Sequence, residues 1–120
     1  MADPLPAEAR DQARWTAALQ AALTALPHVA QTVGLAWTVQ GPFRRSTVWV
    51  TGTVWSDTDD EATNRALLAD VARAAAAALP NLDVPSWVQL SVASASGDNL
   101  RLAALGLGER PTLADLQRLS

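Results

Sequence analysis

The sequence predicts an α+β fold in which helices cover one face of a small, mostly antiparallel sheet, as a two-layer sandwich. Two kinds of pattern lead to this prediction. Three segments alternate between apolar and polar residues, as half-buried strands do. Two longer segments repeat apolar residues every three or four positions, as amphipathic helices do. Their order along the chain is α-β-β-α-β, and an optional fourth strand and a C-terminal helix follow.

The length and composition predict one domain. The chain has 120 residues, and 49% of them are apolar, which is enough to close one modest core. We expect residues 1–5 to form an N-terminal tail and residues 6–95 to form the α-β-β-α-β core. Residues 96–120 then contain a turn, an optional short strand and the C-terminal helix.

The first helix is expected from about Pro6 to Leu26, because Pro27 lacks an amide hydrogen and disfavours helical dihedral angles at the preceding residue. Its apolar stripe consists of Trp15, Leu19, Ala22, Leu23 and Leu26. A strand is expected from Gln31 to Gln40. The side chains predicted to face the interior are Val33, Leu35, Trp37 and Val39. Gly41 to Arg45 then forms the loop of a β-hairpin.

The stretch from Ser46 to Ser56 is expected to be the second strand of this hairpin. One of its faces carries Val48, Val50, Gly52 and Val54, which is an ordinary core face. The opposite face carries Thr47, Trp49, Thr51, Thr53 and Trp55. A face with two indole rings is too apolar to be ordinary solvent-exposed surface. We therefore expect both faces of this strand to have a neighbour.

The second helix is expected to begin near Thr58, because Thr58 and Glu61 have capping-box spacing within the acidic run Asp57 to Glu61. Its core stripe consists of Leu68, Val71, Ala72, Ala75 and Leu79. The third strand is expected from Ser86 to Ala95. Its inward residues are Val88, Leu90 and Val92, and its outward residues are Trp87, Gln89, Ser91 and Ala93.

Two further elements are expected after a turn at Ser96 to Asn99. Leu100 to Leu105 forms a short fourth strand or begins a helical tail. A last short helix follows, because Thr112 and Asp115 have capping-box spacing ahead of apolar residues.

The candidate functional surface is the side of the sheet that the helices leave uncovered. We predict that it is an interface, formed by Trp49, Trp55, Trp87, Thr47, Thr51 and Gln89. Three tryptophans expose on the order of 450–750 Å², compared with roughly 300–600 Å² for the largest apolar patch of a typical monomer. This comparison favours a partner, either another protein or, most simply, a second copy in a two-fold homodimer.

Three alternatives stay open. In the first, the C-terminal segment covers the rings, or the rings pack on their own strand neighbours, and no interface is needed. In the second, a lipid or a small apolar ligand stacks on the rings, with Arg44 and Arg45 of the hairpin as the obvious positive groups. In the third, the chain is a small enzyme with a carboxylate site at Asp57 to Glu61.

The sequence predicts no catalytic residue, no cofactor and no metal site. The chain has no cysteine, and its one histidine, His28, forms neither a triad nor a zinc site by itself. Ser94 to Gly97 lacks the G-x-S-x-G pattern of a nucleophile elbow, and Gly106 to Gly108 lacks the lysine of a phosphate loop. The acidic run is interpreted as helix capping.

Charge and hydropathy limit the class of partner. The net charge is −3 and the basic residues are scattered, so binding to nucleic acid is not expected. The chain has no uninterrupted run of about 18 apolar residues, so no transmembrane segment is predicted. Residues Met1 to Arg10 include acidic groups and no basic leader, which predicts a cytoplasmic protein without a secretory signal.

The segment from Val48 to Val54, VWVTGTV, resembles the second strand of the BON domain, a small bacterial α-β-β-α-β module. That strand often reads V-x-V-x-G-x-V before an Ala-rich helix and a final strand, and the resemblance covers about residues 22–94. It implies the same architecture, binding to membrane lipid or protein, and no catalysis. It also implies a location in the cell envelope.

Overall fold

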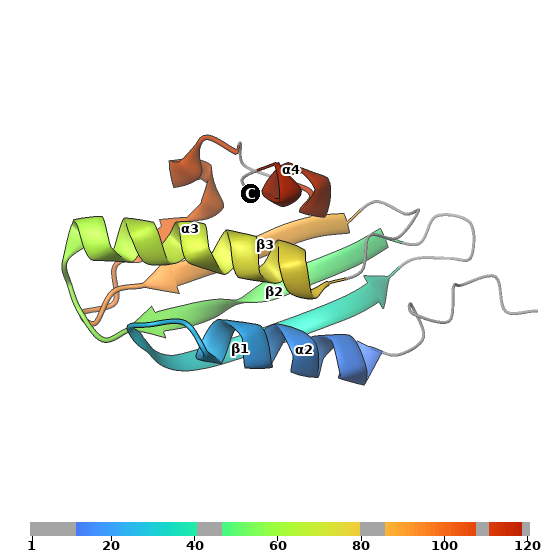
Figure 1. Cartoon of the computed structure of the whole chain (residues 1–120), viewed down its shortest axis with the longest axis horizontal. Coiled ribbons are helices and arrows are strands. Elements are labelled where there is room, and N and C mark those ends of the chain that lie inside the picture. Colours follow the sequence, from blue (N-terminus) through green and yellow to red (C-terminus); the bar gives the residue numbers. More distant parts are fainter. Residues whose placement is uncertain (1–11, 41–46, 80–85, 108–110, 119–120) are drawn as a thin grey trace, which may run out of the picture.

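The structure is a computed structural model, and it describes residues 12–40, 47–79, 86–107 and 111–118. It confirms the predicted α+β class, with a fourth strand and a C-terminal helix (Figure 1). In chain order the elements are α2 (Gln12–Thr24), β1 (Val29–Gln40), β2 (Thr47–Ser56), α3 (Glu61–Ala78), β3 (Ser86–Ala93), β4 (Asn99–Arg101), the 3₁₀-helix η1 (Leu102–Leu105) and α4 (Leu113–Gln117).

The sheet is mixed, and its strand order is β1-β2-β3-β4. β1 pairs with β2 and β3 pairs with β4 in antiparallel fashion, whereas β2 and β3 are parallel. A parallel pair needs a long crossover connection, which α3 provides. β2 therefore lies inside the sheet, between β1 and β3.

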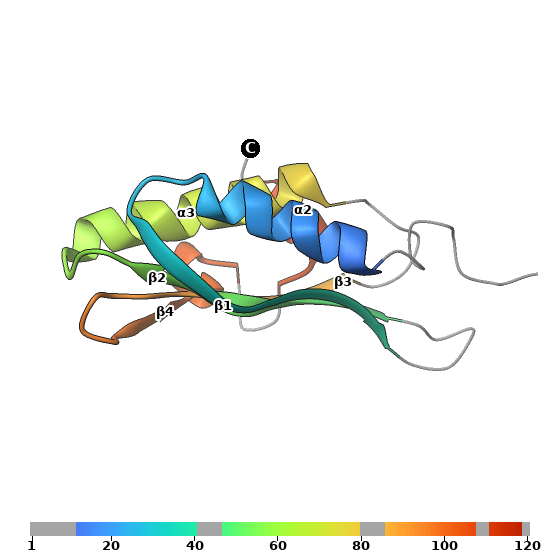
Figure 2. The same cartoon turned by 90° about the horizontal axis from the view of Figure 1, so that it is seen from below.

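The helices α2 and α3 lie on the same face of the sheet, and the core fills the space between the two layers (Figure 2). The predicted inward residues of β2, β3 and α3 are buried there. They are Val48, Val50, Val54, Val88, Leu90, Val92, Leu68, Val71, Ala72, Ala75 and Leu79. The two-layer arrangement is therefore confirmed.

The C-terminal segment extends the helix layer. Leu102, Leu113 and Leu116 are buried in the same core as α3, on the helix side of the sheet (Figure 1). The predicted capping box between Thr112 and Asp115 opens α4. The alternative in which this segment covers the tryptophan side of the sheet is wrong for the described residues, because their leucines pack against α3.

β1 departs from simple alternation because of a bulge at its centre. Gly34 and Leu35 both lie opposite a single residue of β2, Gly52. Gly34 takes the left-handed conformation, with φ 67°, which glycine adopts without strain. The bulge moves the residues before it to the other face. The prediction that Val33 faces the interior is therefore wrong, since it pairs with Thr53 and is 51% exposed.

The start of α3 also differs from the prediction. Asp60 is the N-cap, because its carboxylate accepts a hydrogen bond from the backbone N–H of Thr63 at 2.9 Å. Thr58 lies before the cap, where its hydroxyl accepts a hydrogen bond from the N–H of Asp60 at 3.1 Å. The capping box predicted between Thr58 and Glu61 is wrong, although the acidic run does begin the helix.

Gly52 is predicted to be important for stability, because Leu35 occupies the space that a side chain at position 52 would need. An added Cβ would lie 2.5 Å from Leu35 Cδ2 and 2.8 Å from Leu35 Cα. We expect Gly52→Ala to lower the free energy of unfolding, measured in urea, by about 2–3 kcal/mol. Gly34→Ala is the matched control, since its added Cβ meets no described atom within 4 Å and only the backbone is strained, at about 1 kcal/mol. Equal losses in the two variants would contradict this account.

Candidate functional site

The outer face, by which we mean the side of the sheet opposite α2 and α3, carries three of the tryptophans. Trp49 of β2 and Trp87 of β3 are neighbours in register, with ring centroids 6.5 Å apart and planes tilted by 36°. Trp55 lies beside Ala93 in the same register. All three rings are partly exposed, while the valines between them are buried. The predicted parity of these two strands is confirmed.

Some of the polar groups on the outer face bond to each other. The hydroxyls of Thr53 and Ser91 lie 3.1 Å apart, across the β2–β3 pair. The indole N–H of Trp49 donates to the hydroxyl of Thr47 at 3.1 Å, and the hydroxyl of Thr38 donates to the carbonyl of Trp49 at 3.5 Å. Because these five residues already have partners, covering them with an apolar surface does not leave their bonded groups unsatisfied.

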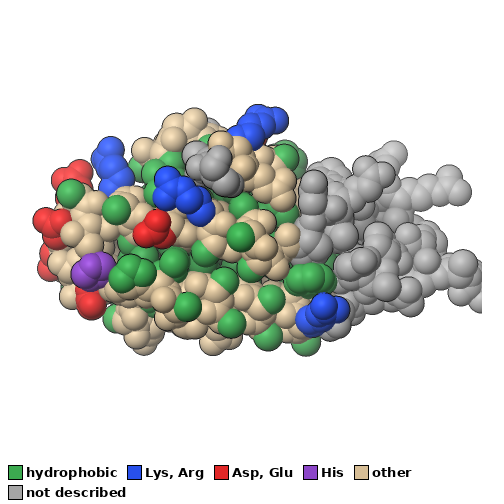
Figure 3. Space-filling view, in the orientation of Figure 1, with side chains coloured by type: hydrophobic (Ala, Val, Ile, Leu, Met, Phe, Trp, Pro, Cys, Tyr) green, Lys and Arg blue, Asp and Glu red, His purple; other side chains and the backbone are tan. Residues whose placement is uncertain are grey.

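The described outer-face positions of β1, β2 and β3 include no charged residue. They are Gln31, Val33, Ala36, Thr38, Thr47, Trp49, Thr51, Thr53, Trp55, Trp87, Gln89, Ser91 and Ala93. The helix side, in contrast, carries arginine and acidic side chains (Figure 3). Loss of charge together with enrichment in tryptophan is the composition of the centre of a protein interface.

Ala93 differs from its prediction in burial. It lies on the outer face as expected, yet it is only 4% exposed. Trp55 and Asn99 flank it on the two neighbouring strands, and a small side chain between larger ones is easily covered.

The free edge of β1 is closed to a further strand. Two bulges interrupt its regular hydrogen-bonding pattern. Beyond them, the hydroxyl of Thr16 on α2 accepts a hydrogen bond from the N–H of Trp37 at 3.0 Å. The side-chain carbonyl of Gln12 accepts from the N–H of Val39 at 3.4 Å. The backbone N–H groups of Trp37 and Val39 are therefore engaged by α2 and are not free to bind another strand.

The outer edge of β3 is shielded at both ends. β4 pairs with Ser91 to Ala93. At the other end, Trp87 forms an isolated antiparallel bridge with Thr112, and the N–H of Val88 donates to the carbonyl of Pro111 at 2.9 Å. Neither edge of the sheet presents a long row of free backbone groups, so contacts through the outer face are favoured over strand addition.

The acidic run Asp57 to Glu61 is held by backbone contacts. Asp59 accepts a hydrogen bond from the N–H of Ser96 at 2.7 Å, and Asp60 caps α3. Hydrogen bonds from the side chain and backbone of Ser96 lower the pKa of Asp59 below its ordinary value of 3.8. Hydrogen bonds from the side chain and backbone of Thr63 lower the pKa of Asp60 in the same way. These carboxylates join two loops and a helix end.

The other residues considered as site candidates from the sequence make structural contacts or lie outside the described residues. Nδ1 of His28 lies 3.1 Å from Oδ1 of Asp57, and both side chains are exposed. Ser94 accepts a hydrogen bond from the N–H of Asp98 at 3.0 Å, within a turn. Within the described ranges, no group of three or more His, Asp or Glu residues is placed to hold a metal ion. Arg44 and Arg45 lie outside the described residues.

None of the described helices is both long enough and apolar enough to cross a membrane.

The contacts that close the β1 edge escape sequence-based prediction. Thr16 and Gln12 lie on a helix whose polar positions look like a solvated surface, and nothing local shows that a strand edge lies against them. The bulge had a usable signal, since a glycine at position 34 interrupts the alternating pattern of β1.

Comparisons of the chain with protein-family models, with curated proteins and with solved structures find no match. The resemblance of residues 22–94 to the BON domain therefore stays a prediction.

The edge contact of Thr16 is expected to be measurable. Thr16→Val leaves the N–H of Trp37 without its hydroxyl partner, so we expect a loss of about 1–2 kcal/mol in unfolding free energy. Amide exchange at Trp37 should accelerate selectively. Thr24→Val is the control, because that hydroxyl donates only to carbonyls of its own helix. Unchanged exchange at Trp37 would show that Thr16 does not close the edge.

Acid is expected to weaken the junction at Asp59 and Asp60. Because their pKa values are lower in the folded protein, the stability they contribute is complete above about pH 4 and is lost as the pH falls through the folded values. Asp60→Asn keeps an N-cap acceptor that does not titrate. Its urea midpoint should match the parent near pH 7 and fall less between about pH 4 and pH 2.

The companion variant Asp60→Ala has neither the acceptor nor the charge. Its urea midpoint should be lower than that of the parent near pH 7 as well. If Asp60→Ala and Asp60→Asn behaved alike near pH 7, the assignment of Asp60 as the cap of α3 would be refuted.

Proposed function

We propose that this protein is a non-enzymatic interaction module that forms a homodimer through the outer face of its sheet. The observation that carries the proposal is the composition of that face, which combines three partly exposed tryptophans with an absence of charge across the described positions of β1–β3. In a monomer these rings contact water, which is unfavourable for apolar surface. Burying them against the same face of a second copy removes that free-energy cost.

The two edges support the face as the site of contact. A second copy joining by strand addition would need free backbone groups along β1 or β3. On β1, bulges and the side chains of α2 interrupt them, and on β3, β4 and the bridge to Thr112 occupy the ends. Face-to-face packing needs no such groups, because side chains of two sheets interdigitate about 10 Å apart.

The area of the face indicates a reversible dimer. β2 has 10 residues, and at about 3.3 Å per residue it is roughly 33 Å long. Three long strands about 4.8 Å apart add a width of roughly 14 Å, which gives a flat footprint of about 460 Å² per copy. Two copies together cover about 900 Å², below the range of about 1,200–2,000 Å² for stable complexes. We therefore expect association at micromolar concentration.

The alternative partners fit the face less well. A flat ligand stacked between Trp49 and Trp87 would need a slot, but their centroids are 6.5 Å apart, within the range of direct ring contact. An anionic membrane would need several positive side chains, and Arg101 of β4 is the single basic residue among the described outer-face positions of the sheet. A carboxylate enzyme would need free acidic groups, whereas Asp59 and Asp60 bind backbone N–H groups.

The dimer is tested by sedimentation velocity between about 1 and 100 µM. We expect a concentration-dependent shift from 12.6 kDa toward twice that mass. Thr51→Arg places a guanidinium at the centre of the face and opposes it to its symmetry mate, so this variant should stay monomeric. Tryptophan emission of the parent should move to shorter wavelength as the dimer forms.

Ala77→Arg is the matched control, because it adds the same charge at an exposed position of α3 on the helix side. It should dimerise as the parent does, and circular dichroism should show that both variants fold. A parent that stays monomeric throughout, or a dimer that Thr51→Arg leaves intact, would remove the proposal.

A further inference from the structure

A pocket of about 530 Å³ opens where the chain leaves the sheet beyond β4. Arg101 pairs with Ser91, so a continued β4 would run on beside the rest of β3. Instead the chain turns into η1 at Leu102, and the next described contacts with β3 are made by Pro111 and Thr112. The missing length of strand leaves a hollow beside the middle of β3, within the size range of small-molecule sites.

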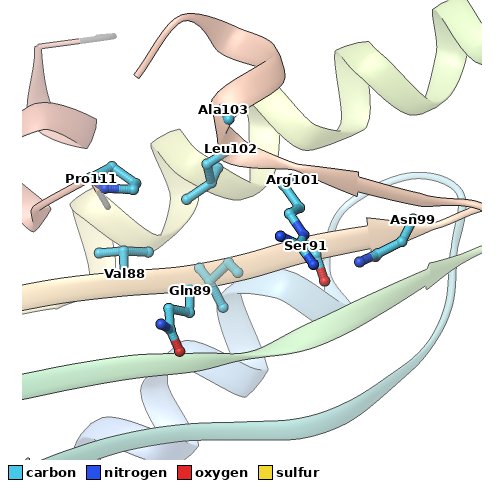
Figure 4. Close-up of a pocket in the computed structure, with 9 residues that line it drawn as sticks. Val88, Gln89, Ser91, Asn99, Arg101, Leu102, Ala103 and Pro111 are labelled. Carbon is cyan, nitrogen blue, oxygen red and sulfur yellow. The ribbon is translucent and has the colours of Figure 1, made fainter. Parts of the chain in front are cut away.

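One end of the pocket is polar. The side chains of Arg101, Asn99 and Ser91 gather there, on the ends of β4 and β3 that face each other (Figure 4). Asn99 and Arg101 are two residues apart on one strand, so they share a face. Among the described residues, neither side chain has a hydrogen-bond or ion-pair partner, and Gln89 nearby has none either.

The other end is apolar. Val88, Leu102 and Pro111 line it, and all three are buried (Figure 4). Val88 and Leu102 belong to the core, so their positions are set by packing rather than by any ligand. The carbonyl of Pro111 is tied to the N–H of Val88 at 2.9 Å, which fixes the wall that closes this end. The apolar wall is therefore formed before anything binds.

Among the described residues that line the pocket, Arg101 has the single charged side chain. A guanidinium without a partner binds a carboxylate through two parallel hydrogen bonds, and the amides of Asn99 and Gln89 supply further donors. An apolar wall opposite favours a compact hydrocarbon group. We propose that this pocket binds a small monocarboxylate, with its carboxylate on Arg101 and its apolar body against Val88, Leu102 and Pro111.

This site adjoins the proposed dimer contact, because Arg101 pairs with the outer-face residue Ser91, and Gln89 lines the pocket as well. The dimer depends on the tryptophans of β2 and β3, whereas Arg101 lies on the short strand at the margin of the sheet. Replacing Arg101 removes one charge from the margin of the outer face and leaves the tryptophans in place, so it should not weaken self-association. Failure of one proposal can be told from failure of the other, because sedimentation reports the dimer and amide shifts report the pocket.

The test is a titration of ¹⁵N-labelled full-length protein with cyclohexanecarboxylate, followed by amide chemical shifts. Saturable shifts should concentrate at Gln89, Leu90, Arg101 and Ala103. Cyclohexanecarboxamide has nearly the same shape without the charge, and it should bind about tenfold more weakly or worse, as expected for loss of a charge-assisted hydrogen bond. Equal binding of the amide would overturn the proposal.

Arg101→Gln should weaken cyclohexanecarboxylate binding by about tenfold or more while its amide spectrum stays that of a folded protein, since Arg101 is exposed and pairs with no described side chain. Arg73→Gln is the matched control, because Arg73 is an exposed arginine of α3 that pairs with Asp70. It should bind as the parent does. Parent-like binding by Arg101→Gln, or shifts confined to the tryptophan face, would overturn the assignment.

Discussion

The alternation of β2 is the constraint on which the rest of this structure depends. Because β2 is an interior strand, its two rows of side chains cannot be exchanged without turning the valines out of the core. Gly52 keeps this arrangement compatible with the bulged neighbour, since Leu35 crosses the strand where any Cβ would stand. The valine row packs against the helix layer. Because side chains alternate along the strand, the tryptophan row faces away from that layer. The outer face is thus a consequence of the core.

The surroundings of the outer face support it as a contact surface, in addition to its composition. A sheet with free edges has three ways to meet a partner, through either edge or through a face. Here polar side chains of α2 occupy the β1 edge, and β4 with the Pro111–Thr112 segment occupies the ends of the β3 edge. The C-terminal helix lies with α3 instead of covering the rings. The surface left over is aromatic and uncharged across the described positions of β1–β3, with Arg101 of β4 at its margin.

The pocket beside β3 comes from a different cause. Antiparallel pairing of β4 stops after three residues because the chain turns into η1, whose Leu102 is buried in the core. A longer β4 would fill the hollow with backbone. The strand's early end leaves Arg101 at the margin of the sheet and lets Pro111 form the opposite wall. Two surfaces with unlike chemistry thus meet along β3. One is formed by the tryptophan rings, and the other by Arg101, whose guanidinium pairs with no described side chain.

Local sequence pattern was sufficient for the fold class, the inward rows of β2, β3 and α3, and the tryptophans of the outer face, because side-chain periodicity depends only on neighbours along the chain. It failed at Val33, where one extra residue in a bulge reverses the parity, and at Thr58, where the helix begins two residues later on Asp60. It also missed the β1 edge contacts and the pocket. These depend on residues distant in sequence, Thr16 with Trp37 and Arg101 with Pro111, and only packing brings such residues together.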